Sequence, residues 1–328
     1  MLDSFEIGNW LDTHSAKYNL SSSAITLDLT PYFKVNSTVN ETQLKELIAE
    51  INGVHPSQVV VTQGATEGLF LVLLYLYRKG YKSYNVKLPD YETIFKVPEI
   101  VGLTKGGDDI FVSSNTNNPL AELRQCDDSY KVCVMDETFL AFHQDLDKVD
   151  YYNDNVFRVN TLSKFYGASI VRIGYIIAPS SEDAKRLEGY KGLIVEPPSP
   201  HNMSIAYNIL KDHYNIAEKV RHLVKENLEF LKREKRMLRF YKDVEPLLST
   251  VSFIDYSYYT EMSSRELAEY LVSKGILVVP GYMFGVDGPY MRVCYSRSDF
   301  KESFKVLIEE LEKIKETGDD IYRSAPKR

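Results

Sequence analysis

Short, unbroken apolar segments alternate with helical segments through the first two thirds of the chain, and this alternation limits the fold more than any other feature. Six strands are predicted from such segments, at residues 59–62, 84–89, 109–114, 131–137, 155–161 and 172–179. A helix is predicted over residues 40–51, capped by Asn40 and ended by Gly53, and a strongly apolar helix ends near Gly80. Strands that are apolar on both faces need cover on both faces. The sequence therefore predicts an α/β fold whose large domain has three layers around a mostly parallel sheet.

The pattern changes in the last third of the chain. One long helix is predicted over residues 214–241, with Val220, Leu223, Leu228 and Leu231 on its inner face. From Val251 a strand, a helix, two strands and a final helix follow, which predicts a compact α+β unit. We expect an N-terminal segment (residues 1–39) packed with the small domain, a large domain (40–235), a small C-terminal domain (236–328) and a frayed polar tail after Glu316.

Polar or aromatic residues follow the ends of several predicted strands. Gly64, Tyr91, Asn118 and Asp136 each stand at or after such an end, and so does the segment 161–164. In a mostly parallel sheet the ligand lies outside the carboxyl ends of the strands. We therefore expect these groups to converge on one site at one edge of the sheet.

Lys164 is the most unusual of these residues. It follows Thr161 and Ser163, and Arg172 stands eight positions after it, in the stretch NTLSKFYGASIVRIGY. A lysine shielded from water has a lowered pKa and acts as an amine nucleophile near neutral pH. The two hydroxyls and the planar guanidinium are groups that bind a phosphate. The structural alternative is a solvated lysine on a turn.

Three further groups each have a functional and a structural interpretation. Gly64 makes a tight turn, after which Ala65 and Thr66 begin a helix. Either the free N–H groups at the start of this helix form an anion site, or the glycine serves the turn alone. Asp136 ends a buried strand, where it either satisfies a structural contact or pairs with a protonated ring nitrogen. Tyr91 is either a core residue or a flat stacking surface for a planar ring.

The same holds for two polar residues further along the chain. Asn118 either forms a turn with Pro119 or donates to a phenolic oxygen. Arg292 lies inside an apolar strand, where a buried arginine needs an anion. Its partner is either a structural carboxylate or the carboxylate of a substrate.

Composition excludes several other classes of protein. The chain of 328 residues has a formal net charge of −7 and no basic stripe, which argues against nucleic-acid binding; the basic run at 232–239 suits the wet face of a helix. The six histidines lack metal-ligand spacing, so we expect no metal site. Cys126, Cys133 and Cys294 lack paired spacing and are expected to be buried free thiols. With no basic and apolar leader and no 18-residue apolar run, we expect a cytoplasmic protein without a membrane segment.

Together these residues resemble the class I/II aminotransferases of the pyridoxal-phosphate-dependent fold type I superfamily, especially the histidinol-phosphate and aspartate aminotransferase branches. The resemblance extends from about residue 40 to the last helix. It implies a homodimer with its sites at the domain and subunit interfaces, pyridoxal phosphate as cofactor, and a ping-pong exchange between an L-amino acid and a 2-oxo acid. It also implies that Lys164 forms the Schiff base and moves the α-proton, and that Asp136 holds the pyridine nitrogen protonated.

The remaining roles come from the same resemblance. Tyr91 stacks on the cofactor ring, and Asn118 hydrogen-bonds its oxygen. Arg292 binds the substrate α-carboxylate, with Asn118 beside it. The phosphate is expected to be bound by Gly64, Ala65, Thr66, Thr161, Ser163 and Arg172.

The chain departs from the family pattern at three places. Asn118 and Pro119 are followed by Leu120 and Ala121, where the family usually has Thr and Gly. Phe139 replaces the tyrosine that usually donates to the ring oxygen, as it also does in a relative that decarboxylates threonine phosphate. Tyr32 is a weak match to the tyrosine that reaches the phosphate from the neighbouring subunit. A pyridoxal-phosphate decarboxylase or lyase is therefore one alternative, and a non-catalytic binding or regulatory protein on the same fold is another.

Overall fold

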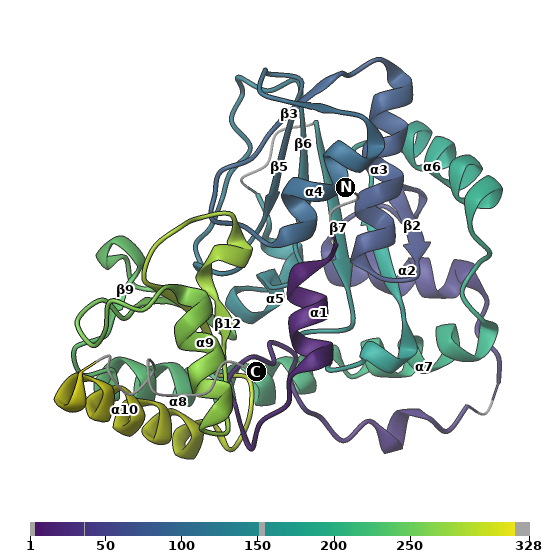
Figure 1. The fold of residues 1–328 in the computed structure, drawn as a ribbon. Helices are drawn as coiled ribbons and strands as arrows, with labels where there is room; N and C mark the ends of the chain where they lie inside the picture. Colours follow the sequence, from purple (N-terminus) through teal and green to yellow (C-terminus); the bar gives the residue numbers. More distant parts are fainter. Residues whose placement is uncertain (1–3, 36, 151–154, 319–328) are drawn as a thin grey trace.

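The computed structural model describes residues 4–35, 37–150 and 155–318, and most of the predicted polar tail (319–328) lies outside them. Within these ranges a seven-stranded sheet has the order β2-β8-β7-β6-β5-β3-β4 (Figure 1). The strands are β2 (Val59–Thr62), β3 (Ser83–Asn85), β4 (Thr104–Lys105), β5 (Ile110–Ser114), β6 (Val132–Asp136), β7 (Val156–Thr161) and β8 (Gly174–Ile177). β8 pairs antiparallel with both β2 and β7, and the other pairs are parallel. The predicted mostly parallel sheet is confirmed.

Helices cover both faces of this sheet, because neighbouring residues of its strands pack into different cores. Val59 and Val61 belong to one apolar cluster, and Val60 between them belongs to the other. One face is covered by α3 (Ala65–Lys79), α4 (Glu92–Val101) and α6 (Ser181–Ile194). The other is covered by α2 (Glu41–Asn52), α5 (Leu140–His143), α7 (Pro200–Lys211) and α8 (His213–Glu234). The three-layer α/β prediction is confirmed.

Two helix boundaries show how local chemistry sets an end. Asn40 caps α2 by accepting from the backbone N–H of Gln43 at 2.9 Å, and Gly53 ends it in the left-handed conformation, as predicted. α8, in contrast, ends at Glu234, seven residues before the predicted end at 241. Arg236 has a positive φ of 51°, and Phe240 beyond it is buried in a strand. The basic run at 232–239 therefore lies only partly on a helix.

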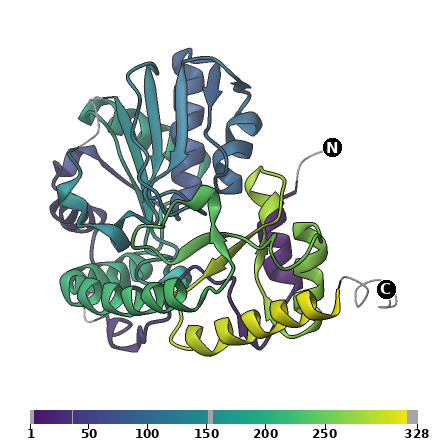
Figure 2. The same cartoon turned by 90° about the vertical axis from the view of Figure 1, so that its left-hand side faces the viewer.

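A second, antiparallel sheet of order β12-β13-β10-β9 forms the C-terminal part of the chain (Figure 2). Its strands are β9 (Arg239–Phe240), β10 (Val251–Asp255), β12 (Val279–Pro280) and β13 (Tyr290–Cys294), and its helices are α9 (Ser264–Ser273) and α10 (Phe300–Thr317). β13 lies between β10 and β12, so its middle residue, Arg292, is held from both sides. The α+β character predicted for this part agrees with these elements.

The N-terminal segment joins the two parts of the molecule. β1 (Tyr18–Asn19) pairs in parallel with β11 (Ile276–Leu277) of the C-terminal part. In α1 (Glu6–Thr13), the Trp10 indole donates to the carbonyl of Val278 at 2.9 Å. The first amides of the same helix bond to Glu92 at the start of α4. The contacts with β11 and Val278 support the proposed packing of residues 1–39 with the small domain.

The cysteine prediction was wrong for two of three residues. Cys126 and Cys133 form a disulfide, with Cα atoms 5.8 Å apart, whereas Cys294 is a buried free thiol, as expected. The seven-residue separation carries no pairing signal; the pairing arises because the loop before β6 returns alongside that strand. In the described part of the chain no helix has the length and apolarity to cross a membrane, and no group of three or more ligand-type side chains is placed to hold a metal ion.

Candidate active site

A cavity of about 530 Å³ opens at the carboxyl ends of the large sheet. All twelve site residues predicted from the sequence line it, and they come from five parallel strands, the segment before β8, and β13 of the second sheet. They are Gly64, Ala65, Thr66, Tyr91, Asn118, Asp136, Phe139, Thr161, Ser163, Lys164, Arg172 and Arg292. Their convergence follows from the strand order, because all strands except β8 point the same way.

One end of the cavity is built to receive an anion. α3 begins at Ala65 with its first amides free of side-chain caps, directly after Gly64, whose φ is 103°. A Cβ on Gly64 would make a tight 3.1 Å contact with Nη2 of Arg172, and the positive φ of this residue is one that favours glycine. The hydroxyls of Thr161 and Ser163 lie 3.0 Å apart on the same side of the cavity. Helix amides, two hydroxyls and an arginine form the donor set that a phosphate needs.

Lys164 follows β7 and is half-buried in the cavity wall. Burial, and next the positive charge of Arg292, lower the pKa of the Lys164 ammonium to about 8. Asp136 and Arg172 also act on this charge, in opposite directions. Desolvation therefore brings the pKa of Lys164 nearer to neutral pH, which favours its action as an amine nucleophile.

Asp136 ends β6 and is buried. Its Oδ1 accepts from the backbone N–H of Thr138 at 3.0 Å and from the Thr138 hydroxyl at 2.5 Å. Burial raises the pKa of this carboxyl, and the Thr138 donors oppose that rise. A carboxylate oriented in this way at the base of a cavity is suited to bind a protonated ring nitrogen.

Arg292 is 2% exposed, yet no carboxylate among the described residues forms an ion pair with it. Its Nη1 donates to Oδ1 of Asn118 at 3.2 Å and its Nη2 to the carbonyl of Ser21 at 3.0 Å. Its Nε is buried with no hydrogen-bond partner. A buried cation without a counter-ion is costly unless an anion arrives, so this guanidinium fits the anion of a substrate.

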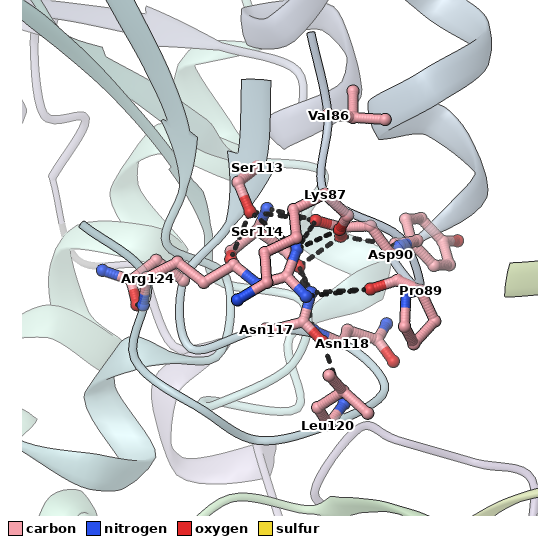
Figure 3. Close-up of polar contacts among 12 residues, drawn as sticks. Val86, Lys87, Pro89, Asp90, Ser113, Ser114, Asn117, Asn118, Leu120 and Arg124 are labelled. Atoms are coloured by element: carbon pink, nitrogen blue, oxygen red, sulfur yellow. Dashed lines mark hydrogen bonds and ion pairs between the residues drawn. The ribbon is translucent and has the colours of Figure 1, made fainter. Parts of the chain in front are cut away.

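A buried ion pair behind the cavity was missed by sequence reasoning (Figure 3). Asp90 is fully buried, and Arg124 pairs with its carboxylate at 3.1 Å. Asp90 also accepts from the backbone N–H of Tyr91 at 2.7 Å and from the hydroxyl of Ser114. The Ser114 hydroxyl in turn accepts from the backbone N–H of Asn118 at 2.9 Å. The pair thus joins the loops that carry Tyr91 and Asn118.

The signal for this pair in the sequence was weak. Asp90 follows a proline and resembles an ordinary turn aspartate. Arg124 also binds the carbonyls of Lys87 and Pro89, which lie beyond the end of β3 at Asn85; the predicted strand extended to 89. The partners are 34 residues apart in sequence.

The residues present fit pyridoxal phosphate. A buried carboxylate for the ring nitrogen, an amine with a lowered pKa and a phosphate-type donor set all line the same cavity. Arg172 lies close to Gly64, at the end of the cavity that carries this donor set. This fold and this site define a pyridoxal-phosphate-dependent enzyme of fold type I.

Comparison with known proteins narrows the class. The family model described as "Aminotransferase class I and II" matches residues 124–309, which is more than half of the chain. A histidinol-phosphate aminotransferase from Caldicellulosiruptor saccharolyticus is 28% identical over 313 residues, covering 83% of this chain and 82% of that protein. An aspartate aminotransferase from Thermococcus kodakarensis is 24% identical over 307 residues, covering 84% and 80%. The chain belongs to the class I and II aminotransferases, and its cofactor is pyridoxal phosphate.

A solved structure agrees at the level of the fold. The structure of a PLP-dependent aminotransferase from Streptococcus suis 89-1591 is similar over the full length of both chains, with a TM-score of 0.78 and 21% sequence identity.

Proposed function

We propose that this enzyme moves an amino group between an L-amino acid and a 2-oxo acid by a ping-pong mechanism. The observation that carries the proposal is Arg292, a buried guanidinium with no carboxylate partner in the described residues, in the same cavity as Lys164 and Asp136. An α-carboxylate would supply the missing anion and would place the α-carbon in the cavity beside the lysine.

Each side chain then has a role that its chemistry allows. Pyridoxal phosphate supplies an electron sink that stabilises negative charge on the α-carbon of a bound amino acid. Lys164 would hold the cofactor through Nζ between turnovers and, once displaced by the amino acid, would carry the proton from the α-carbon to C4′ of the cofactor. The lowered pKa keeps a useful fraction of this amine neutral at physiological pH.

The other residues position the reacting groups. Asp136 holds a proton on the ring nitrogen, and Tyr91 supports the ring face. Asn118 has its Oδ1 on Arg292, which leaves its amide N–H groups for the ring oxygen. Gly64, Ala65, Thr66, Thr161, Ser163 and Arg172 are proposed to bind the phosphate.

The test is a half-reaction screen on the purified holoenzyme. Each L-amino acid is added without a 2-oxo acid, and the visible band of the bound cofactor is followed while the 2-oxo acid product is measured. We expect the 2-oxo acid product in an amount stoichiometric with the enzyme. A different 2-oxo acid, added next, should restore the visible band of the cofactor in a second half-reaction. Lys164→Ala should bind the cofactor without completing either half. No product with any amino acid would contradict the proposal.

Decarboxylation is the second candidate, and Phe139 is the observation that favours it. Phe139 lines the cavity, is 4% exposed and stacks on Phe142 with ring centroids 6.0 Å apart. Because it is a phenylalanine, it brings no hydroxyl to this position. The same screen separates the two reactions. Release of CO₂ with an amine product, in place of a 2-oxo acid, would identify a decarboxylase.

A further inference from the structure

The outer half of the cavity is walled by two helices that sequence reasoning did not connect with the site. α1 contributes Ile7 and Leu11, with Phe5 just before it, and α4 contributes Val97 and Ile100. In Figure 1, α1 lies next to α4 on the side of the C-terminal part. Phe5, Leu11 and Ile100 are 43%, 36% and 67% exposed. Apolar side chains are therefore exposed in the same cavity that holds Lys164 and Arg292.

The charged groups of this wall bind one another. Glu92 is buried, and its two carboxylate oxygens accept the backbone N–H groups of Glu6 and Ile7, each at 2.8 Å. Lys96 donates to the same carboxylate at 2.7 Å and to the carbonyl of Ser4 at 3.1 Å. The Glu92 carboxylate thus fastens the first turn of α1 to α4, and neither charge is left for a ligand.

The remaining cations of the cavity already have proposed partners. Lys164 serves the cofactor, Arg172 its phosphate, and Arg292 the α-carboxylate. Among the described residues that line the cavity, no cation remains for a second acidic group on the substrate. A carboxylate or phosphate moved into the apolar wall would lose its hydration without gaining a partner.

We propose that the wall formed by α1 and α4 is the side-chain subsite of the substrate, and that it takes an α-amino acid with an uncharged, apolar side chain. This holds only if the chain acts on amino acids, as proposed above. Leucine and phenylalanine are representative of the class. Such a side chain differs from that of aspartate, which gives one relative its name and carries a second carboxylate.

The first experiment compares side chains of equal size on the holoenzyme. Leucine, asparagine and aspartate have side chains with the same number of non-hydrogen atoms. Single-turnover rate constants at low substrate should favour leucine over aspartate by at least about 100-fold, with asparagine between them. In the series from alanine to norleucine the rate should rise about fourfold per methylene, because each buried methylene is worth about 0.8 kcal/mol.

A binding measurement without turnover complements the rates. 4-Methylpentanoate and succinate are leucine and aspartate without the amino group, so neither can react. Calorimetry with the holoenzyme should show that 4-methylpentanoate binds at least about tenfold more tightly. Equal or tighter binding of succinate would overturn the apolar subsite.

A matched pair of variants assigns the preference to the wall. Ile100→Arg adds a cation at an exposed position of the cavity, and should raise the aspartate-to-leucine rate ratio at least about tenfold. Leu193→Arg makes the same change at a leucine that is 90% exposed on α6, which does not line the cavity, and should leave the ratio unchanged.

The outcomes separate this inference from the proposed function. Preference for leucine, with a shift in Ile100→Arg alone, supports the subsite. Preference for aspartate or glutamate in the unmodified enzyme overturns the subsite and leaves an aminotransferase. Reaction with no amino acid overturns both. An equal shift of the aspartate-to-leucine rate ratio in both arginine variants would show that long-range charge sets the preference, and this would also overturn the subsite.

Discussion

Arg292 shows how one residue can be read from its surroundings. Its position inside an apolar strand was visible in the sequence, but its partner was not. In the structure its hydrogen bonds go to Asn118 and to the carbonyl of Ser21, and its Nε has none. These neutral acceptors orient the guanidinium without neutralising it. The residue is therefore placed to bind an anion, and its contribution to folding should be smaller than its contribution to substrate binding.

Arg292→Lys tests this balance. Lysine keeps the charge but loses the planar two-pronged contact, so amino-acid affinity should fall about 10- to 150-fold for the loss of about 1.5–3 kcal/mol. The melting temperature should stay within about two degrees. Binding of the amine that lacks the carboxylate should barely change. Arg297→Lys, in the partly exposed pair with Asp299, is the control. Equal losses for the amino acid and its amine would contradict carboxylate binding.

Lys164 gives a pH-dependent prediction in the cofactor-free protein. Its pKa of about 8 lies below the ordinary lysine value of 10.5, first because of burial and then because of Arg292. Between these values the unfolded chain binds more protons, so this group should make the free energy of unfolding rise with pH. Competitive amine labelling with peptide mapping should find a midpoint for Lys164 near 8 when folded and near 10.5 in denaturant. Arg292→Gln should raise the folded midpoint; an unchanged midpoint would remove that cause.

At the scale of elements, the loops after β3 and β5 depend on each other. Neither loop has regular structure where it carries Tyr91 or Asn118 into the cavity. The buried Asp90–Arg124 pair supplies the missing order, since its hydrogen bonds reach the backbone of Tyr91 directly and that of Asn118 through Ser114 (Figure 3). Burial raises the pKa of Asp90 to about 6, so the carboxylate is ionised at neutral pH, where it faces Arg124.

Asp90→Asn should therefore be strongly destabilising. It leaves the Arg124 guanidinium buried without a counter-charge, and the expected loss is about 3–5 kcal/mol in the free energy of unfolding. Denaturant titration at pH 7.5 measures it. Glu245→Gln breaks the exposed pair with Lys232 and should cost less than about 1 kcal/mol. A loss for Asp90→Asn as small as that of the control would show that the loops hold their shape without the pair.

On the scale of the whole molecule, the site exists only where two sheets meet. The large sheet supplies Lys164 and Asp136, the small sheet supplies Arg292, and α1 of the N-terminal segment closes the outer wall. Segments from both ends of the chain are thus needed for one cavity. The end of the cavity proposed to bind the phosphate remains open in a single chain, because Thr66 and Arg172 are both exposed there. Tyr32, the weak candidate to reach a neighbouring phosphate, donates to Asp212 at 2.5 Å within the single chain.

We predict that the enzyme is a homodimer in solution, whose second copy covers this open end. Sedimentation velocity of the holoenzyme should give one species of twice the 37.7 kDa chain mass. Removing the cofactor should weaken the dimer if the phosphate lies at the interface. A monomer at micromolar concentration, with full activity, would contradict both statements.

The sequence by itself determined the layers and the site-bearing edge of this protein. Periodicity is a local property, so continuous apolar strands and amphipathic helices such as α2 could be predicted with their caps at Asn40 and Gly53. The strand ends then placed Lys164, Asp136 and their neighbours together, because parallel strands share one carboxyl edge. Gly64 and Arg172 were predicted as site residues from the chemistry that a phosphate requires, and both line the cavity.

Only the tertiary structure decided which distant groups pair. The Asp90–Arg124 pair spans 34 residues and the Glu92 bond to the α1 amide of Glu6 spans 86. The Cys126–Cys133 disulfide spans only seven residues, yet it too depends on how a loop returns to a strand. α8 ended early because Phe240 gains a strand and a buried site beyond it. Such pairings depend on distances that the packed core sets, and a local pattern along one chain carries no record of those distances.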